Sequence, residues 1–191
     1  LPPTEIEQGK LSGAIQDQQG LFNLNNLVRD GNSSARDIDI LKRLLRTIGL
    51  RTDLADAIAD WIDADSALQS PEGAEDAYYL NLATPYRTAN QPMSAIEELL
   101  RVRGCDHVTV ARLRQFVTVL PRRTPVNVNM APPEVLVAIV DGLTLPEAVV
   151  LAGSRRTAPF PGREDFRTRL PRTELNVNNE DISVDTQFFL V

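Results

Sequence analysis

The segment from residue 60 to residue 76, DWIDADSALQSPEGAED, places the tightest limit on how this chain can fold. It carries six carboxylates, and no Lys or Arg follows until Arg87. Carboxylates that are packed together repel one another unless they stay in water or share a cation. The segment also lacks helical or strand periodicity, and this irregularity extends from Asp63 to Pro92. A loop of that length inside a compact domain is usually functional or disordered.

Residue types alone leave two interpretations of the acidic segment open. It is either a solvated loop whose Asp side chains cap helices, or an irregular cation site. Calcium suits the second interpretation, because it takes about six to eight oxygen ligands from a flexible loop, whereas magnesium prefers few carboxylates. Zinc fits poorly, since the chain has one His and one Cys. The EF-hand pattern also fails, because Leu68 stands where a loop starting at Asp63 needs Gly. The candidate metal ligands are Asp63, Asp65 and Glu75, then Asp76, with Asp60 one turn earlier on a helix end.

The charge of the chain is unevenly distributed. Residues 1–100 carry eight Lys and Arg against sixteen Asp and Glu, while residues 101–191 carry twelve against ten. An acidic half does not favour nucleic acid or anionic lipid, since phosphates need clustered Lys and Arg. No apolar run approaches the roughly 20 residues that cross a bilayer. The chain starts at Leu1-Pro2-Pro3 without a Met, so we expect it to be a fragment.

Strand patterns at the two ends of the chain flank a helical middle. Residues 11–28 and 182–191 have short alternating apolar runs, which are typical of strands. Apolar residues from Ile38 to Ile48 lie on one face of a helix, and Gly49 ends it. The order predicts an α+β fold in which one sheet is interrupted by a helical block. Further helices are expected at 53–61, from 94 to 100, and at 108–120, 132–139, 144–153 and 164–170.

The sequence predicts no catalytic or cofactor-binding residue. His107 and Cys105 lie two positions apart, with no third group to orient them. No Gly-rich phosphate loop, G-x-S-x-G or HExxH motif occurs.

A second functional hypothesis rests on residues 126–155. The run from Val126 to Leu136, followed by Asp141-Gly142-Leu143, resembles a helix-hairpin-helix module, which presents backbone amides to DNA phosphates. Only Gly142 of the expected Gly-x-Gly is present, and no Lys flanks the hairpin. A nucleic-acid-binding module therefore stands as the alternative function.

Three Asn-containing segments recur at points where extended chain enters a turn or helix. Because Asn side chains satisfy backbone groups there, we predict a structural role for them. The segments are Phe22–Asn26, Val126–Asn129 and Leu175–Asn179.

Several segments together resemble the minor pseudopilin K family of the type II secretion system, also called general secretion pathway protein K. They occur in the same order over nearly the whole chain, and the DWIDAD and GAEDAYY pair is the most specific. They are 17–27 (DQQGLFNLNNL), 60–65 (DWIDAD), 73–79 (GAEDAYY), 90–100, 126–136 (VNVNMAPPEVL) and the closing Phe188-Phe189 strand.

The resemblance implies a fold with two parts. A pilin-like antiparallel sheet would come from residues 1–33 and 171–191, and residues 34–170 would form a large inserted α-helical domain with helix-hairpin-helix or SAM-like elements. It also implies a structural calcium ion at the acidic segment.

The resemblance further implies a non-catalytic role in assembly. Members of the family sit at the tip of the periplasmic pseudopilus, in a complex with the I and J minor pseudopilins, and start or control its assembly and protein secretion. They are anchored in the inner membrane of Gram-negative bacteria by an N-terminal helix. From the sequence we expect this chain to be a fragment without that helix and with a shortened C-terminal extension.

Overall fold

A computed structural model describes residues 4–6, 9–11 and 14–190 of the chain, and combines helices with very short strands. The α-helices are α1 (Ala35–Thr47), α2 (Leu54–Ile62), α3 (Asp76–Tyr79), α4 (His107–Leu113), α5 (Pro133–Ile139), α6 (Leu145–Ser154) and α7 (Arg163–Thr168). Two 3-10 helices, η1 (Leu24–Leu27) and η2 (Ile96–Arg101), accompany them. The strands are β1 (Thr4–Ile6), β2 (Gly9–Leu11), β3 (Gln16–Asp17), β4 (Phe22–Asn23), β5 (Val28–Arg29), β6 (Asn32–Ser33), β7 (Val117–Thr118), β8 (Val126–Asn127), β9 (Ile182–Ser183) and β10 (Phe189–Leu190).

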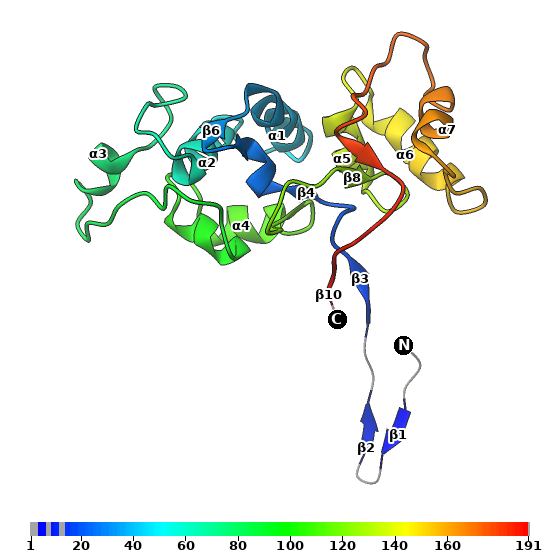
Figure 1. The fold of residues 1–191 in the computed structure, drawn as a ribbon, viewed down its shortest axis with the longest axis horizontal. Helices are drawn as coiled ribbons and strands as arrows, with labels where there is room; N and C mark the ends of the chain where they lie inside the picture. The colour runs from blue at the N-terminus through cyan, green and yellow to red at the C-terminus, as the bar shows by residue number, and fades with distance from the viewer. Residues whose placement is uncertain (1–3, 7–8, 12–13, 191) are drawn as a thin grey trace.

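The helices gather in two groups on either side of a narrow stem (Figure 1). Helices α1 to α4 form one group, and α5 to α7 form the other. Helix α1 packs against both α2 and α5, so it joins the two groups. Strands β3 and β10 form the stem, and the β1–β2 hairpin lies at its far end. Among the described residues, none of the helices has the length and apolar character that a membrane crossing requires.

Helix α1 confirms the amphipathic pattern predicted for residues 38–48. The Ser34 hydroxyl accepts a hydrogen bond from the backbone N–H of Asp37, which caps the first turn. The apolar face is buried, and Gly49 ends the helix with a φ of +69°, a conformation that favours glycine. Its buried apolar residues are Ile38, Ile40, Leu41, Leu44 and Leu45.

The strands pair in twos and bring distant parts of the chain together. Strand β10 pairs antiparallel with β3, so residues 189–190 lie beside residues 16–17. Two other pairs are parallel: β4 with β7, and β8 with β9. Each of these pairs has only two residues per strand. Hydrogen bonds between strands therefore supply few of the contacts that hold distant parts of the chain together.

One of the helix predictions is wrong. The helix expected at 108–120 ends at Leu113, because the chain then turns to pair with β4, and the N–H of Phe22 donates to the carbonyl of Phe116 (2.9 Å). β-branched residues follow at 117–119, and they favour the extended form. Asp53 occupies the N-cap position of α2, and its side chain pairs with Arg51.

Buried Asn side chains supply the long-range bonds that the short strands lack. The Asn25 amide donates to the carbonyls of Met93 and Leu120 (both 2.9 Å), and its oxygen accepts the Met93 N–H (2.8 Å). Asn26 exchanges the same pair of bonds with the backbone of Thr124 (2.8 and 3.1 Å). These side chains act as substitutes for a neighbouring strand, with partners far along the sequence rather than local ones.

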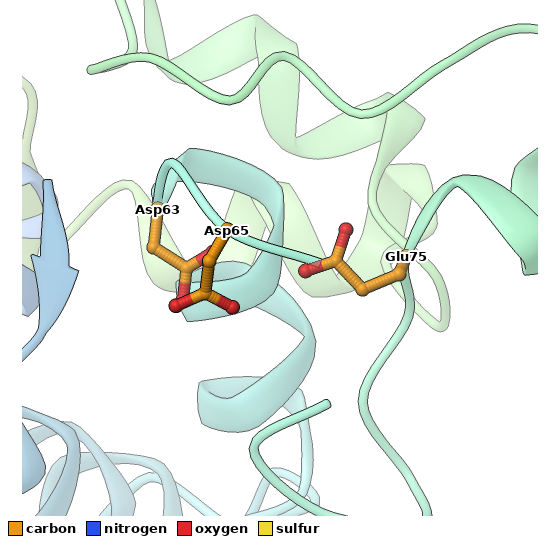
Figure 2. Close-up of side chains that lie close together, drawn as sticks. All are labelled: Asp63, Asp65 and Glu75. Carbon is orange, nitrogen blue, oxygen red and sulfur yellow. The ribbon is translucent and has the colours of Figure 1, made fainter. Parts of the chain in front are cut away.

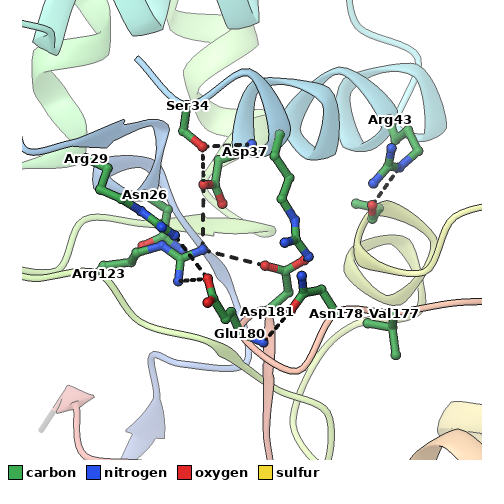
Figure 3. A network of polar contacts seen from close by, with 12 residues as sticks. Asn26, Arg29, Ser34, Asp37, Arg43, Arg123, Val177, Asn178, Glu180 and Asp181 are labelled. Carbon is green, nitrogen blue, oxygen red and sulfur yellow. Dashed lines mark hydrogen bonds and ion pairs between the residues drawn. The ribbon is translucent and has the colours of Figure 1, made fainter. Parts of the chain in front are cut away.

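A cluster of ion pairs joins the start of α1 to the chain before β9 (Figure 3). Arg123 lies 3.7 Å from Asp37 and 3.6 Å from Asp181, and Arg36 also pairs with Asp181. Asp37 and Asp181 are both buried, so each depends on these cations to offset the cost of burial. The cluster fixes the C-terminal segment against the first helix.

Replacing Asn25 with Leu is expected to lower the free energy of unfolding by about 3 kcal/mol or more, because it leaves three buried backbone groups without partners. Urea denaturation of the purified chain measures the change. The control is Asn179→Ala, because Asn179 is exposed and a change of no more than about 0.5 kcal/mol is expected there. Equal losses in the two variants would contradict the structural role of Asn25.

Candidate metal centre

The acidic segment leaves the end of α2, loops outward and returns to the start of α3. Asp63 is the C-cap residue of α2, and its N–H donates to the carbonyl of Ala59 (2.9 Å). Glu75 precedes α3 as its N-cap residue. The two ends of the loop are therefore fixed by helix termini, whereas the residues between them have no regular structure.

Three of the predicted ligands come together at the base of this loop. Asp63, Asp65 and Glu75 each offer a carboxylate oxygen, and these oxygens all lie within 4.8 Å of one another. Figure 2 shows the carboxylates of Asp63 and Asp65 side by side, with Glu75 reaching toward them from the returning chain. We call these three residues the carboxylate group.

The carboxylate group lacks the partners that buried charges normally have. Asp63 and Glu75 are buried, and one oxygen of Asp63 and both oxygens of Glu75 accept no hydrogen bond. Among the described residues, no Lys or Arg forms an ion pair with any of the three. The amide of Gln69 donates to the other oxygen of Asp63 (3.3 Å), and the N–H of Ala67 donates to Asp65 (2.7 Å).

Burial and repulsion between neighbouring carboxylates raise the pKa of Asp63 and Glu75. Burial is the main reason that the pKa of Asp63 rises to about 6, and the neighbouring carboxylates of Asp65 and Asp60 add to it. The pKa of Glu75 rises to about 7, again mainly through burial and then through the charges of Asp60, Asp63 and Asp65. A divalent cation would remove this penalty, because it pairs with the ionised forms and satisfies the free oxygens. The donor set therefore fits a hard cation that prefers oxygen ligands.

The other two predicted ligands have different partners. Asp60 accepts hydrogen bonds from the backbone N–H groups of Gln69 (3.0 Å) and Ala74 (2.8 Å). Asp76 pairs with Arg87 (2.7 Å) and accepts from the N–H and hydroxyl of Thr88 (3.0 and 2.9 Å). These contacts, the Thr88 hydroxyl above all, lower the pKa of Asp76. Both residues hold the loop in place and lie outside the carboxylate group.

Two residues near the group were not predicted. Gln69 bonds Asp63 through its side chain and Asp60 through its backbone, and Gly73 lies against Asp60. Gly73 is the sole glycine in the acidic segment, which was the available sequence signal. No pattern pointed to Gln69, because its role depends on how the loop folds back.

An aromatic cluster forms around Trp61, near the end of α2. Trp61, the chain's sole Trp, makes edge contacts with the rings of Tyr79 and Tyr86 at centroid distances of 5.3 and 6.1 Å. Trp61 is buried and lies two residues before Asp63. It is therefore well placed to transfer excitation energy to a luminescent lanthanide bound at the carboxylate group.

The remaining chemically notable residues carry no comparable arrangement. Cys105 is buried, and that burial raises the pKa of its thiol to about 12, so it stays protonated at neutral pH. His107 is exposed at the start of α4.

The turn between α5 and α6 was the other candidate site. Gly142 has a φ of +79°, as a tight hairpin requires. The N–H and hydroxyl of Thr144 both donate to the carboxylate of Glu147 (2.9 and 2.7 Å). The amide that would meet a phosphate is thus already bonded to an acidic side chain, and Asp141 lies exposed beside it. These acidic side chains do not favour a nucleic-acid backbone, and the nearby cation, Arg172, is already paired with Glu147 (2.9 Å).

Comparison with known proteins finds one family over most of the chain. Two family models described as Type II secretion system (T2SS), protein K match residues 20–122 and 126–185. The type II secretion system protein K of Pseudomonas aeruginosa is 35% identical, with 100% of this chain and 58% of that protein covered. The Aeromonas hydrophila protein of the same name is 34% identical, with 95% of this chain and 60% of that protein covered. The chain thus spans about three-fifths of the length of these relatives.

The fold also matches that of a solved structure. A chain in the crystal structure of the GspK–GspI–GspJ complex from the type 2 secretion system of enterotoxigenic Escherichia coli matches with a TM-score of 0.81 and 25% sequence identity. The match covers 98% of this chain and 70% of that chain.

In metal-free buffer the carboxylate group is expected to make the fold less stable as the pH rises. Below about pH 4, the ordinary pKa of Asp and Glu, folded and unfolded chains are both protonated at Asp63 and Glu75. Between pH 4 and the raised pKa values of about 6 and 7, the unfolded chain loses protons that the folded chain keeps, so the free energy of unfolding falls with pH.

The variant Glu75→Gln isolates this effect, because it removes one titrating group. Relative to the unchanged chain, it should become more stable as the pH rises from 5 to 8, measured by urea denaturation. Glu72→Gln is the matched control, since Glu72 is exposed in the same loop and outside the carboxylate group. If the free energies of unfolding of Glu75→Gln and Glu72→Gln change with pH in parallel, Glu75 does not destabilise the folded chain as predicted.

Proposed function

The chain belongs to the type II secretion system protein K family, and from this we propose that it is a minor pseudopilin at the tip of the pseudopilus. There it forms a complex with the I and J minor pseudopilins of the same secretion system and initiates or controls pseudopilus assembly and protein secretion. The fold match over 98% of the chain to a chain of the GspK–GspI–GspJ crystal structure carries this proposal.

We propose that the chain is organised as a pilin-like sheet portion and an inserted helical domain. Residues 1–33 and 171–191 form the first part, although residues 1–3, 7–8, 12–13 and 191 lie outside the described ones. Residues 34–170 form the second, with α5 and α6 as its helix-hairpin-helix or SAM-like element. The pairing of β3 with β10 supports this division, because it joins the two ends of the chain.

We infer a structural calcium ion at the carboxylate group, held by Asp63, Asp65 and Glu75. Two buried carboxylates with free oxygens and no basic partner among the described residues support the inference. Calcium fits better than magnesium, because three clustered carboxylates on an irregular loop suit its larger and more variable coordination shell. When bound, the ion would neutralise the group and tie the returning chain at Glu75 to the end of α2.

The proposed role is non-catalytic and periplasmic. The buried, protonated thiol of Cys105 and the solitary exposed His107 offer no nucleophile–base pair. In the full-length protein we expect an N-terminal helix to provide the anchor in the inner membrane of a Gram-negative bacterium. A nucleic-acid-binding role is not favoured, because Asp141 lies in the turn between α5 and α6 and Glu147, in the first turn of α6, accepts the N–H of Thr144.

The stem is the best candidate for the contact with the I and J subunits. Phe189 and Leu190 of β10 are 55% and 58% exposed, and Ile15, just before β3, is 54% exposed. Each strand of this pair has one neighbour among the described strands, so its outer edge is free to add another strand. Exposed apolar side chains beside open strand edges are typical of a protein–protein interface.

Calcium is expected to raise the melting temperature of the chain, because it binds the folded form and relieves the repulsion among Asp63, Asp65 and Glu75. The double change Asp63→Ala and Asp65→Ala should abolish the rise, and Glu75→Gln should reduce it strongly. Differential scanning calorimetry with calcium and with a chelator measures these shifts. The control Glu72→Gln should keep the full response, and an unchanged melting curve of the original chain with calcium would refute the site.

Charged substitutions in the stem should weaken assembly with the I and J subunits. The pair Phe189→Asp and Leu190→Asp is expected to reduce affinity roughly 30-fold, which corresponds to about 2 kcal/mol, by placing charges in an apolar contact. Isothermal titration with the purified head domains of the two subunits measures it.

The matched control for the stem is the pair Val108→Asp and Val150→Asp. These residues are 76% and 74% exposed on α4 and α6, within the helical groups. They should leave the affinity unchanged. A larger loss in this control than in the stem variant would move the interface to the helices.

A further inference from the structure

We propose that Asp60 is a positioning residue for the cation: its carboxylate closes the loop so that Glu75 meets Asp63 and Asp65. The inference rests on the proposed calcium site and assigns Asp60 a role different from that of a ligand. Three observations support it: the hydrogen bonds of Asp60, the lack of space at Gly73, and the position of Glu75 directly after Ala74.

The two oxygens of Asp60 hold two separate points of the loop. One oxygen accepts the N–H of Gln69 (3.0 Å), and the other accepts the N–H of Ala74 (2.8 Å). Asp60 lies in the last full turn of α2 and is completely buried. A carboxylate that accepts backbone N–H groups in a buried setting makes strong, charge-assisted bonds. The loop is therefore clamped onto the helix that carries Asp63.

Gly73 permits this clamp, because a larger residue would collide with Asp60. A Cβ atom on Gly73 would lie 2.1 Å from one Asp60 oxygen and 3.1 Å from the carbonyl of Ser70. The carbonyl of Gly73 in turn accepts a hydrogen bond from Arg103 (2.9 Å). The peptide chain at Gly73 is thus enclosed between Asp60 and Arg103, and only glycine fits this approach.

The clamp sets the position of the returning ligand. Ala74 is bonded directly to Asp60, and Glu75 is the next residue. Asp63 lies three residues after Asp60 at the end of the same helix. Asp60 thus fixes the distance between the chain segments that carry Asp63 and Glu75. Without it, repulsion between the two carboxylates would separate these segments.

The same contacts separate Asp60 from the ligands. Its oxygens are not among those that lie within 4.8 Å of one another, and each already has a backbone donor. By contrast, both oxygens of Glu75 have no donor. Groups that orient metal ligands without touching the ion typically change metal affinity about 10- to 100-fold when they are removed.

Terbium(III) binding tests this assignment, with emission excited through Trp61. Asp60→Asn replaces one acceptor with an amide that cannot accept from a backbone N–H, and Gly73→Ala displaces Asp60 while keeping every carboxylate. Each variant should bind terbium about tenfold or more weakly. The number of water molecules on the bound ion, from emission lifetimes in H2O and D2O, should stay unchanged, because no ligand is lost.

The double variant should bind about as weakly as the weaker single variant, since both changes open the same clamp. Two controls match the substitutions. Glu72→Gln removes an exposed charge from the loop, and Gly153→Ala adds a methyl group where no atom lies within 4 Å. Both should bind terbium as the unchanged chain does, at a temperature where circular dichroism shows every variant to be folded.

The outcomes separate the two proposals. If the unchanged chain binds neither terbium nor calcium, the proposed metal site is wrong. If it binds but Asp60→Asn and Gly73→Ala keep their affinity, or if Asp60→Asn adds a water molecule to the ion, Asp60 does not act by positioning. Should Asp60→Asn not fold, Gly73→Ala decides the question by itself, because it alters no charge.

Discussion

The fold depends on buried Asn amides that replace the backbone ladders of a larger sheet. Strands of two or three residues cannot hold helices together across a long chain, because each pair contributes few hydrogen bonds. Asn25 and Asn26 extend the network from η1 to backbone groups near residues 93, 120 and 124. These partners lie in two different connections, one before η2 and one between β7 and β8, so one short segment of the chain holds both in place.

The acidic segment shows how the same residue type takes opposite roles within one loop. Asp60 and Asp76 have all the donors they need and act as clamps on the loop. Asp63 and Glu75 are buried with oxygens that have no donor, which is the costly state. Burial without partners is what distinguishes Asp63 and Glu75 from Asp60 and Asp76, since all four are acidic, close together and near a helix end.

The boundary between the two protein K family models lies near the ion-pair cluster. The two family models divide near residue 124, close to Arg123, which links Asp37 of α1 to Asp181 before β9. The ion pairs thus fix the start of α1 to the chain segments that precede β8 and β9. In the proposed assembly, the stem would face sister subunits, and the loop with the carboxylate group would lie away from it.

Local pattern in the sequence was sufficient for helix α1, for the strand character of the chain ends and for the three carboxylates that meet. Periodicity, capping residues and charge density act over a few residues, so they can be read directly. Tertiary structure decided the rest. It ended the helix expected at 108–120 by pairing β7 with β4, it gave Asn25 partners that lie far along the chain, and it turned Asp60 inward to the backbone of its own loop. Those outcomes depend on which distant backbone groups come within hydrogen-bond reach, and only the folded chain determines that.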